Sequence, residues 1–476
     1  MTAIILLSFL AYLLAIFVIS WLSSGRNSNS NEAFYLANRS TPWWVVAIGM
    51  IGDSISGVTF VSVPGMVGAY GMSYIQLCIG FFLGYIAVAY ILLPLYYRLR
   101  VVSIYEYLGQ RYGRTTYRTG AFFFVISKLF GAAAKLYLIS LILQSLAFDA
   151  LGIPYPLTVL GLVLLIWLYT RRGGMGTIIW TDVLQTISLV LALGLIIYEL
   201  SAQLGLGFGD LVDLVGASEY HRIFHWQDWM SPQHVLKQIL SGAFIVIVMT
   251  GLDQNMMQKN LSCRSLSEAQ KNMLSYGFSF IPLNYLFLVL GILLLYYAES
   301  QGITLPDKGD EILPYLASNY LGKSVLVFFT LGITAASFSN ADSALTSLTT
   351  SVCVDLIDMP EDRAAATRRR NWVHLGMCSL FALLVLFIGG MQQSSVLNTI
   401  FVAVSYTYGP LLGLYAYGLI CHRAVRDSYT PLVCISAPLL SHLASMALAS
   451  MGYNMGYELL LLNGLITMLG LWLIRR

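Results

Sequence analysis

The segment VVAIGMIGDSISGVTFVSVPG, residues 45–65, is long and apolar enough to cross a bilayer, yet it carries Gly, Asp and Ser at its centre. A second segment, ILSGAFIVIVMTGLDQNMMQ at residues 239–258, is interrupted in the same way. Such breaks in corresponding helices of two halves are typical of membrane carriers built from inverted repeats, in which unwound backbone lines a binding site. Close helix packing through small residues is the alternative explanation of the glycines.

The composition of the chain is that of an integral membrane protein. Of its 476 residues, 58% are hydrophobic and 10% are charged, against about 25% charged in soluble domains. Its mean hydropathy is +0.74, and the net charge of +3 is spread over loops, so no nucleic-acid partner is expected. Apolar runs near 20 residues predict an all-α polytopic protein. The thirteen expected spans are 3–23, 43–66, 73–97, 119–147, 154–170, 177–200, 236–258, 273–297, 324–354, 372–390, 395–419, 430–450 and 455–474.

The orientation follows from the basic residues, which collect on the cytoplasmic side of short loops. With the N-terminus outside, most of the 26 Lys and Arg residues, Lys259 among them, fall in cytoplasmic segments. Those left outside are Arg222, Lys237, Lys308 and Lys323. We therefore expect a cytoplasmic C-terminus in a plasma membrane, here a bacterial inner membrane.

The breaks between spans are short, so residues 1–476 are expected to form one transmembrane domain. The six cysteines show no metal-ligand spacing and are expected to be free thiols. The expected parts are an N-terminal helix and loop (1–40), a first five-helix repeat (41–200), a second one (236–420) and two C-terminal helices (421–476).

The stretch FSNADSALTSLTT, residues 338–350, places a stripe of oxygen-bearing side chains on one helix face. The members of the stripe recur at spacings of three and four residues: Ser339, Asp342, Ser343, Thr346, Ser347 and Thr350. Carboxylate and hydroxyl oxygens suit a hard cation such as sodium. Alternatively, the hydroxyls bond back to the preceding helical turn and serve only packing.

The sequence resembles the sodium:solute symporter family, which includes bacterial sialic acid, galactose and proline transporters and sodium–glucose transporters. The resemblance rests on SISGVTFVSVPG (54–65), GGMGTIIWTDVLQ (173–185), GLDQNMMQKNLSC (251–263) and the stretch 338–350. It implies a leucine-transporter-like core of two inverted five-helix repeats. It also implies sodium-coupled uptake of a small polar solute, such as a sugar, sugar acid or amino acid, by alternating access.

The resemblance implies one or two sodium ions. The first is expected to bind the backbone carbonyls of Gly52, Ile55 and Ala336 and the side chains of Ser339 and Asn340, the last of which stands where the family usually has serine. The second is expected at Asp182, Ser339, Asp342 and Ser343. Capping or pairing near a helix end is the alternative role of Asp182.

The solute site is expected beside the first break. By position, the resemblance suggests Ser54, Ser56, Thr59, Gln76 and Tyr406 as solute contacts.

Two lysines within one predicted span, and an aspartate in the first break, depart from the family pattern. Lys128 and Lys135 lie seven residues apart, on one face of a span, and Asp53 lies in the first break. We expect Asp53 and Lys135 to form a pair that lines the solute site. A structural salt bridge, or a Lys128 that extends to the membrane surface, is the alternative.

Rival classes are less well supported. The chain has no His-Glu-x-x-His run or catalytic loop motif, so we do not expect an enzyme. A transporter-fold solute sensor and a proton-coupled carrier remain alternatives. The expected partners are a small polar solute, sodium as the only metal ion and the lipid bilayer, and the expected assembly is a monomer.

Overall fold

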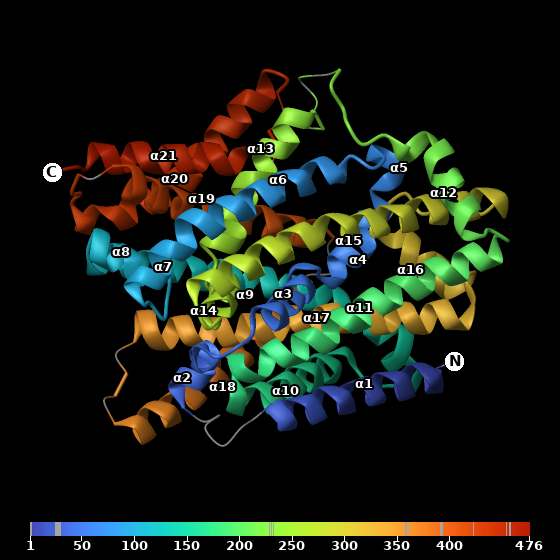
Figure 1. Cartoon of the computed structure of the whole chain (residues 1–476), viewed down its shortest axis with the longest axis horizontal. Helices are drawn as coiled ribbons and strands as arrows, with labels where there is room; N and C mark the ends of the chain where they lie inside the picture. The colour runs from blue at the N-terminus through green and yellow to red at the C-terminus, as the bar shows by residue number, and fades with distance from the viewer. Residues whose placement is uncertain are drawn as a thin grey trace.

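The computed structural model is all-helical, and its long helices run in broadly the same direction, with the N- and C-termini at opposite ends (Figure 1). It describes residues 2–23, 30–227, 229, 231, 233–357, 359–360, 362–390, 394–421, 423–453, 455–456 and 458–476. Within these ranges, the side chains of residues 2–5, 146–147, 172 and 394–405 lie outside the description.

The first half of the chain contains the first predicted repeat. Its α-helices are α1 (Thr2–Ser23), α2 (Asn31–Leu36), α3 (Trp43–Ser54), α4 (Gly57–Gly65), α5 (Val67–Tyr70), α6 (Tyr74–Ala87), α7 (Leu93–Leu99), α8 (Glu106–Arg111), α9 (Arg114–Leu143), α10 (Tyr155–Gly173), α11 (Met175–Gln203) and α12 (Phe208–Ala217).

The second half repeats the pattern of a broken helix followed by long ones. Its helices are α13 (Val235–Val246) with the π-helical turn η6 (Ile247–Gly251), α14 (Gln254–Leu261), α15 (Leu266–Ser300), α16 (Gly309–Asn319), α17 (Gly322–Ser351) with η7 (Val352–Leu356), α18 (Arg363–Gly390), α19 (Ser394–Ile420), α20 (Thr430–Ser450) and α21 (Leu459–Leu473).

Both predicted helix breaks are present. The chain bends by 63° between α3 and α4, and by 67° between η6 and α14. At the first break Ile55 and Ser56 adopt extended backbone angles, and Ser56 caps α4. At the second, Asp253 caps α14 by accepting a hydrogen bond from the Met256 N–H. The polar residues within the apolar segments therefore serve to end one half-helix and begin the next.

All thirteen predicted spans are helical. By length and composition, eight helices of the described residues can cross a membrane, and the two bent pairs raise this number to ten. The apolar stretches Tyr155–Arg171 and Leu459–Leu473 are shorter. The number of true crossings thus stays a prediction.

Some glycines allow helices to pack closely, which is the alternative explanation that the sequence analysis gave for them. An added Cβ at Gly242 of α13 would lie 2.5 Å from the Leu77 carbonyl oxygen of α6. Gly80 of α6 lies equally tightly against the backbone of α13 at Ile239. Small residues thus let these two helices approach closely.

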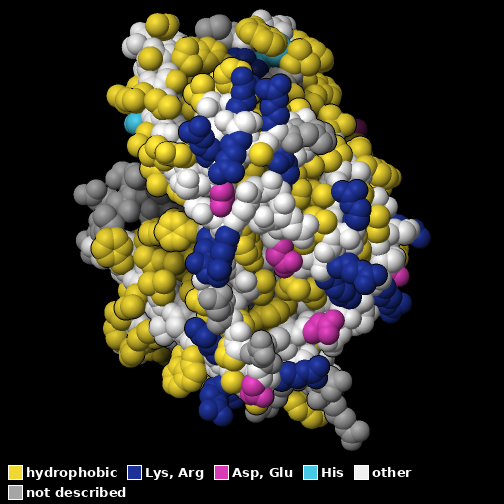
Figure 2. All heavy atoms as spheres, turned by 90° about the vertical axis from the view of Figure 1, so that its left-hand side faces the viewer, with side chains coloured by type: hydrophobic (Ala, Val, Ile, Leu, Met, Phe, Trp, Pro, Cys, Tyr) yellow, Lys and Arg dark blue, Asp and Glu magenta, His cyan; other side chains and the backbone are white. Residues whose placement is uncertain are grey.

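Basic side chains gather at the end of the molecule that holds α7, α8 and the C-terminus, where Lys and Arg are spread over the surface (Figures 1 and 2). This end is the one predicted to face the cytoplasm. The distribution agrees with the predicted orientation, which remains a prediction.

The described cysteines make no disulfide: all six are free, and five are buried. This confirms the expectation of free thiols.

Candidate functional site

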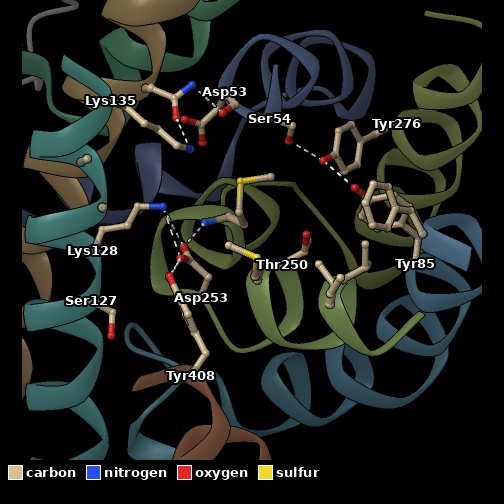
Figure 3. A pocket seen from close by; sticks show the side chains of 18 residues that line it. Asp53, Ser54, Tyr85, Ser127, Lys128, Lys135, Thr250, Asp253, Tyr276 and Tyr408 are labelled. Atoms are coloured by element: carbon tan, nitrogen blue, oxygen red, sulfur yellow. Dashed lines mark hydrogen bonds and ion pairs between the residues drawn. The ribbon is translucent and has the colours of Figure 1, made fainter. Parts of the chain in front are cut away.

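A cavity of about 210 Å3 is lined by residues of both helix breaks (Figure 3). Its walls come from both halves of the chain, which is the arrangement expected of a site at a repeat interface. The lining residues are Asp53, Ser54, Phe81, Tyr85, Ser127, Lys128, Gly131, Ala132, Lys135, Ile245, Val246, Met249, Thr250, Asp253, Met256, Tyr276, Asn340 and Tyr408.

One wall of the cavity holds a buried ion pair. Lys128 of α9 lies with its Nζ 3.2 Å from Oδ2 of Asp253, whose side chain is 2% exposed. The Tyr408 hydroxyl of α19 donates to the same carboxylate at 2.9 Å. Asp253 therefore joins α9, α14 and α19, and its charge is neutralised by Lys128. Lys128 is thus part of a salt bridge, but its partner is Asp253 and not the predicted Asp53.

The second lysine of α9 has a different environment. Lys135 Nζ donates to Oδ1 of Asn340 at 3.2 Å. No carboxylate of a described residue lies within 4.0 Å of this nitrogen. The predicted pair of Asp53 with Lys135 is therefore wrong: Asp53 is paired with Lys259 instead, at 3.2 Å.

The wall opposite the lysines is lined by hydroxyl groups (Figure 3). Ser54, at the end of α3, forms a hydrogen bond with the Tyr276 hydroxyl of α15. The Tyr85 hydroxyl of α6 donates to that of Tyr276 at 2.8 Å. The cavity thus places a cationic group on one side and neutral hydroxyls on the other.

The Asn340 amide, one of the groups predicted for the first sodium ion, bonds to the backbone at the first break. Nδ2 of Asn340 donates to the Asp53 carbonyl at 2.8 Å and to the Ala336 carbonyl at 3.3 Å. These hydrogen bonds tie α17 to the break in α3, which is the connection expected of a sodium ion. The other ligands expected here are the carbonyls of Gly52 and Ile55 and the hydroxyl of Ser339, which donates instead to Asp182 Oδ1 at 2.6 Å.

A buried lysine lies beside Asp182, one of the residues predicted for the second sodium ion. Lys259 is 1% exposed, with Nζ 2.6 Å from Asp182 Oδ2 and 3.2 Å from Asp53 Oδ2. Its assignment to a cytoplasmic segment was wrong, because α14 turns inward after the second break and carries it into the core. The pairing alternative for Asp182 is correct. Asp53 also accepts from Nδ2 of Asn255 at 2.6 Å.

Asp342 lies one turn along α17 from Ser339 and is fully buried. Its Oδ2 accepts from the Tyr169 hydroxyl at 2.6 Å, and no basic side chain of a described residue lies within 4.0 Å of it. The hydroxyls of Ser343 and Thr346, on the same stripe of α17, are buried without a described hydrogen-bond partner. Much of the stripe bonds back to the preceding turn, as Thr350 does to Thr346, but these two hydroxyls do not.

Four of the predicted solute contacts lie outside the lining of this cavity. Ser56 and Thr59 bond to each other in the cap of α4. Gln76 accepts from the backbone N–H of His225 at 3.1 Å and so holds the loop before α13. Tyr406 contacts α20 through His442. Of the predicted contacts, Asp53, Ser54 and Lys135 do line the cavity.

Gln254 links the second helix break to the segment between α7 and α8, which lies at the basic end of the molecule. Its Oε1 accepts from the Ile104 N–H at 2.9 Å, and its Nε2 donates to the Val102 carbonyl at 3.0 Å. The Tyr105 hydroxyl donates to the Leu252 carbonyl at 3.0 Å beside them. These bonds fasten the segment between α7 and α8 to the second break.

Sequence reasoning missed Tyr85, Tyr276 and the role of Lys259. The two tyrosines lie in ordinary apolar spans that carry no polar signal. For Lys259 a signal existed, because α14 reads QNMMQKNL, a polar run directly after a break, and all eight of its residues are buried.

Two bent helices, packed around a buried polar cavity within a polytopic helical bundle, define the class of membrane carriers with inverted repeats. The family model of the sodium:solute symporter family matches residues 34–427. The chain belongs to this family, and its fold is leucine-transporter-like.

The chain is similar to curated transporters over most of its length. It is 27% identical over 401 residues to the sodium-dependent multivitamin transporter of Oryctolagus cuniculus, and this matched region covers 81% of this chain and 61% of that protein. It is 25% identical over 418 residues to the sodium-coupled monocarboxylate transporter 1 of Mus musculus, covering 83% and 65%. The chain thus spans less than two thirds of the length of these two relatives.

Two solved structures share the fold. A Na+-coupled sialic acid symporter in a substrate-bound outward-open state superposes with a TM-score of 0.83 at 18% identity, covering 99% of this chain and 97% of that chain. Mhp1, a nucleobase-cation-symport-1 family transporter, gives a TM-score of 0.56 at 15% identity, with 94% of each chain covered.

Proposed function

We propose that this chain is a secondary active symporter that couples sodium entry to the uptake of a small organic solute bearing a carboxylate. Family membership and the leucine-transporter-like fold support sodium-coupled symport by alternating access. The proposal places the basic end of the molecule in the cytoplasm and the chain in a plasma membrane, as the bacterial inner membrane expectation holds. It is not an enzyme.

The observation that carries the solute class is Lys135. Its ammonium faces the cavity beside a neutral amide, whereas Lys128 and Lys259 each have a carboxylate partner. Asp53 and Asp253 interact with Lys135 electrostatically, but no carboxylate of a described residue lies within 4.0 Å of its nitrogen, so a solute carboxylate could form the direct ion pair that the chain does not supply. The names of several relatives, among them the monocarboxylate transporter and the sialic acid symporter, agree with an acidic solute.

The size of the cavity and the groups on its far wall limit further which solutes can bind. A volume of about 210 Å3 lies below the roughly 300–1,000 Å3 of pockets for drug-sized ligands, so the solute is small. The hydroxyls of Ser54 and Tyr276 face Lys135 across the cavity. They suit a solute with a carboxylate at one end and a hydroxyl or carbonyl group at the other.

Coupling follows from linkage between the two ligands. Sodium held on α17 would stabilise the arrangement of α3 and α17 around the solute, and the solute would raise the sodium affinity by the same factor. A carrier that opens to one side at a time then links the two fluxes.

The test is uptake into proteoliposomes that contain the purified chain. Lactate, a sialic acid, glucose and proline, each radiolabelled, would be offered under an inward sodium gradient and under choline. We expect sodium-dependent uptake of a carboxylate that unlabelled carboxylates inhibit and glucose does not. Equal uptake in choline would refute sodium coupling, and an added pH gradient would then test the proton-coupled alternative. Preferential uptake of glucose would refute the solute class.

A further inference from the structure

A groove lined by three arginines opens at the basic end of the molecule, where α2 and α7 lie (Figure 1). Its volume is about 670 Å3, and its walls come from three separate segments of the chain. Arg39 follows α2, Arg100 follows α7, and Arg264 follows α14. We call it the basic groove. It shares no lining residue with the cavity that holds Lys135, so it is a separate site.

The three guanidinium groups have most of their donors available. Nη2 of Arg39 donates to the Val101 carbonyl at 2.8 Å, and Nε of Arg264 donates to the Ser40 carbonyl at 3.1 Å. The Arg100 side chain makes no hydrogen bond to a described residue. The remaining N–H groups can bind an oxyanion, and phosphate and carboxylate are the anions whose geometry suits guanidinium.

Acidic side chains do not neutralise these arginines. Glu32 also lines the basic groove, but no ion pair within 4.0 Å joins it to any of the three. Glu268 acts electrostatically on Tyr97 in the groove wall and is not itself a lining residue. The lining thus carries three positive charges and one negative charge. Because like charges in one groove repel one another, an anion bound between them removes an unfavourable interaction.

A smaller hollow beside the basic groove indicates where the membrane surface lies. Its volume is about 420 Å3, and Arg264 lines both it and the groove. Trp180 of α11 lines the hollow and is 40% exposed. Its ring centroid lies 6.4 Å from that of Trp44, near the start of α3, which is 47% exposed. Exposed tryptophans in membrane proteins lie at the level of the lipid headgroups, so the groove adjoins the headgroup region.

The backbone at the groove and the hollow is strained. The non-glycine residues of the described chain with a positive φ have values from 47° to 55°, and they are Ala37, Asn38, Arg39 and Arg100. All four line the groove or the hollow. Asparagine tolerates this left-handed conformation, but alanine and arginine adopt it at a cost. Strain of this kind is concentrated at ligand-binding sites, where the placement of side chains outweighs local stability.

We propose that the basic groove binds the phosphate headgroup of an anionic phospholipid in the leaflet at the basic end of the molecule. The arginines contact the phosphate, and the tryptophan pair favours a lipid over a soluble phosphate because it sets the site at the membrane surface. A bound headgroup joins the segments that follow α2, α7 and α14. The site is independent of sodium and of the solute, so the proposal goes beyond the proposed function.

The test measures the unfolding midpoint of the detergent-purified chain, because a ligand that binds only the folded state raises that midpoint. Phosphatidylglycerol, phosphatidylcholine and inorganic phosphate are added separately, at one ionic strength. We expect a saturable rise with phosphatidylglycerol, and none with phosphatidylcholine or inorganic phosphate. Equal rises with the two lipids would overturn recognition of an anion, and an equal rise with inorganic phosphate would overturn the lipid assignment.

Variants locate the response in the groove. Arg100→Gln combined with Arg264→Gln should raise the phosphatidylglycerol fraction for half-maximal stabilisation about 25-fold, at about fivefold for each charge. Arg100→Gln alone removes no described hydrogen bond, so it should fold normally and raise that fraction about fivefold. Arg423→Gln combined with Arg426→Gln is the matched control, because it removes two exposed arginines from the same end, outside the groove. The proposal is overturned if the groove variants keep the wild-type response, or if the control changes it as much.

Discussion

Replacing Lys135 with methionine should weaken solute binding while leaving the fold intact. The ammonium of Lys135 makes one hydrogen bond within the chain, to Asn340 at 3.2 Å, and no ion pair among the described residues. A hydrogen bond to a charged group contributes about 1.5–3 kcal/mol. Because each 1.4 kcal/mol corresponds to about a factor of ten, KM for a carboxylate solute should rise about 10- to 150-fold.

Lys128→Met is the matched control, because it removes the same charge from the same face of α9. Its partner Asp253 has a side chain that is 2% exposed, so the variant leaves a buried carboxylate without its cation. Loss of one partner of a buried pair costs about 3–5 kcal/mol, and the lower end applies here since Lys128 is itself 19% exposed. We therefore expect Lys128→Met to lower the unfolding midpoint and Lys135→Met to leave it nearly unchanged.

The assay compares initial uptake rates in proteoliposomes over a range of concentrations of a transported carboxylate and of its uncharged amide. Lys135→Met should raise KM for the acid and leave KM for the amide unchanged. The reasoning is refuted if Lys135→Met keeps the wild-type KM for the acid, or if the acid and the amide are affected equally.

Three further changes test other contacts. Asn340→Ser replaces the amide at the first break by a hydroxyl that can coordinate sodium, so an additional sodium should bind; an unchanged sodium titration of the unfolding midpoint would contradict this. Gln254→Leu removes two hydrogen bonds to the backbone at Val102 and Ile104, at about 1 kcal/mol each, and should increase the labelling, from the basic end of the molecule, of a cysteine introduced into the cavity lining; unchanged labelling of that cysteine would show that these bonds do not hold this end closed. Gly242→Leu places a side chain where a Cβ alone lies 2.5 Å from the Leu77 carbonyl, so the helices α6 and α13 must separate and the midpoint should fall; an unaltered midpoint would contradict the close packing.

The fold was accessible from the sequence because its signals are local. Runs of apolar residues specify the spans, and polar residues within residues 45–65 and 239–258 mark the two breaks. A residue such as Ser56 or Asp253 that caps the second half-helix is recognisable from its own position. Such features can be recognised without knowing which helices pack against one another.

The partners of the buried charged side chains could not be predicted in this way. Lys259 follows an apolar span by a few residues, which is where basic residues usually mark the cytoplasmic surface. Only the 67° bend before α14 turns it inward to Asp182. Asp53 was paired with Lys135 by proximity to the first break, but the nearer cation came from a helix about 200 residues away. Such pairings depend on the relative placement of three helices, which no single stretch of sequence encodes.

Lys135, whose ammonium faces the cavity, favours an anionic solute under the proposed function, and the charge of that solute sets how far it can be accumulated. A carrier that moves one sodium ion together with one monovalent anion transfers no net charge across the membrane. A resting potential of about 100 mV, which contributes about 2.3 kcal/mol for each charge moved inward, then adds nothing to the driving force. Accumulation is limited to the sodium concentration ratio itself, so a tenfold sodium gradient sustains about tenfold accumulation. A carrier of this stoichiometry has less concentrating power, but its uptake does not depolarise the cell.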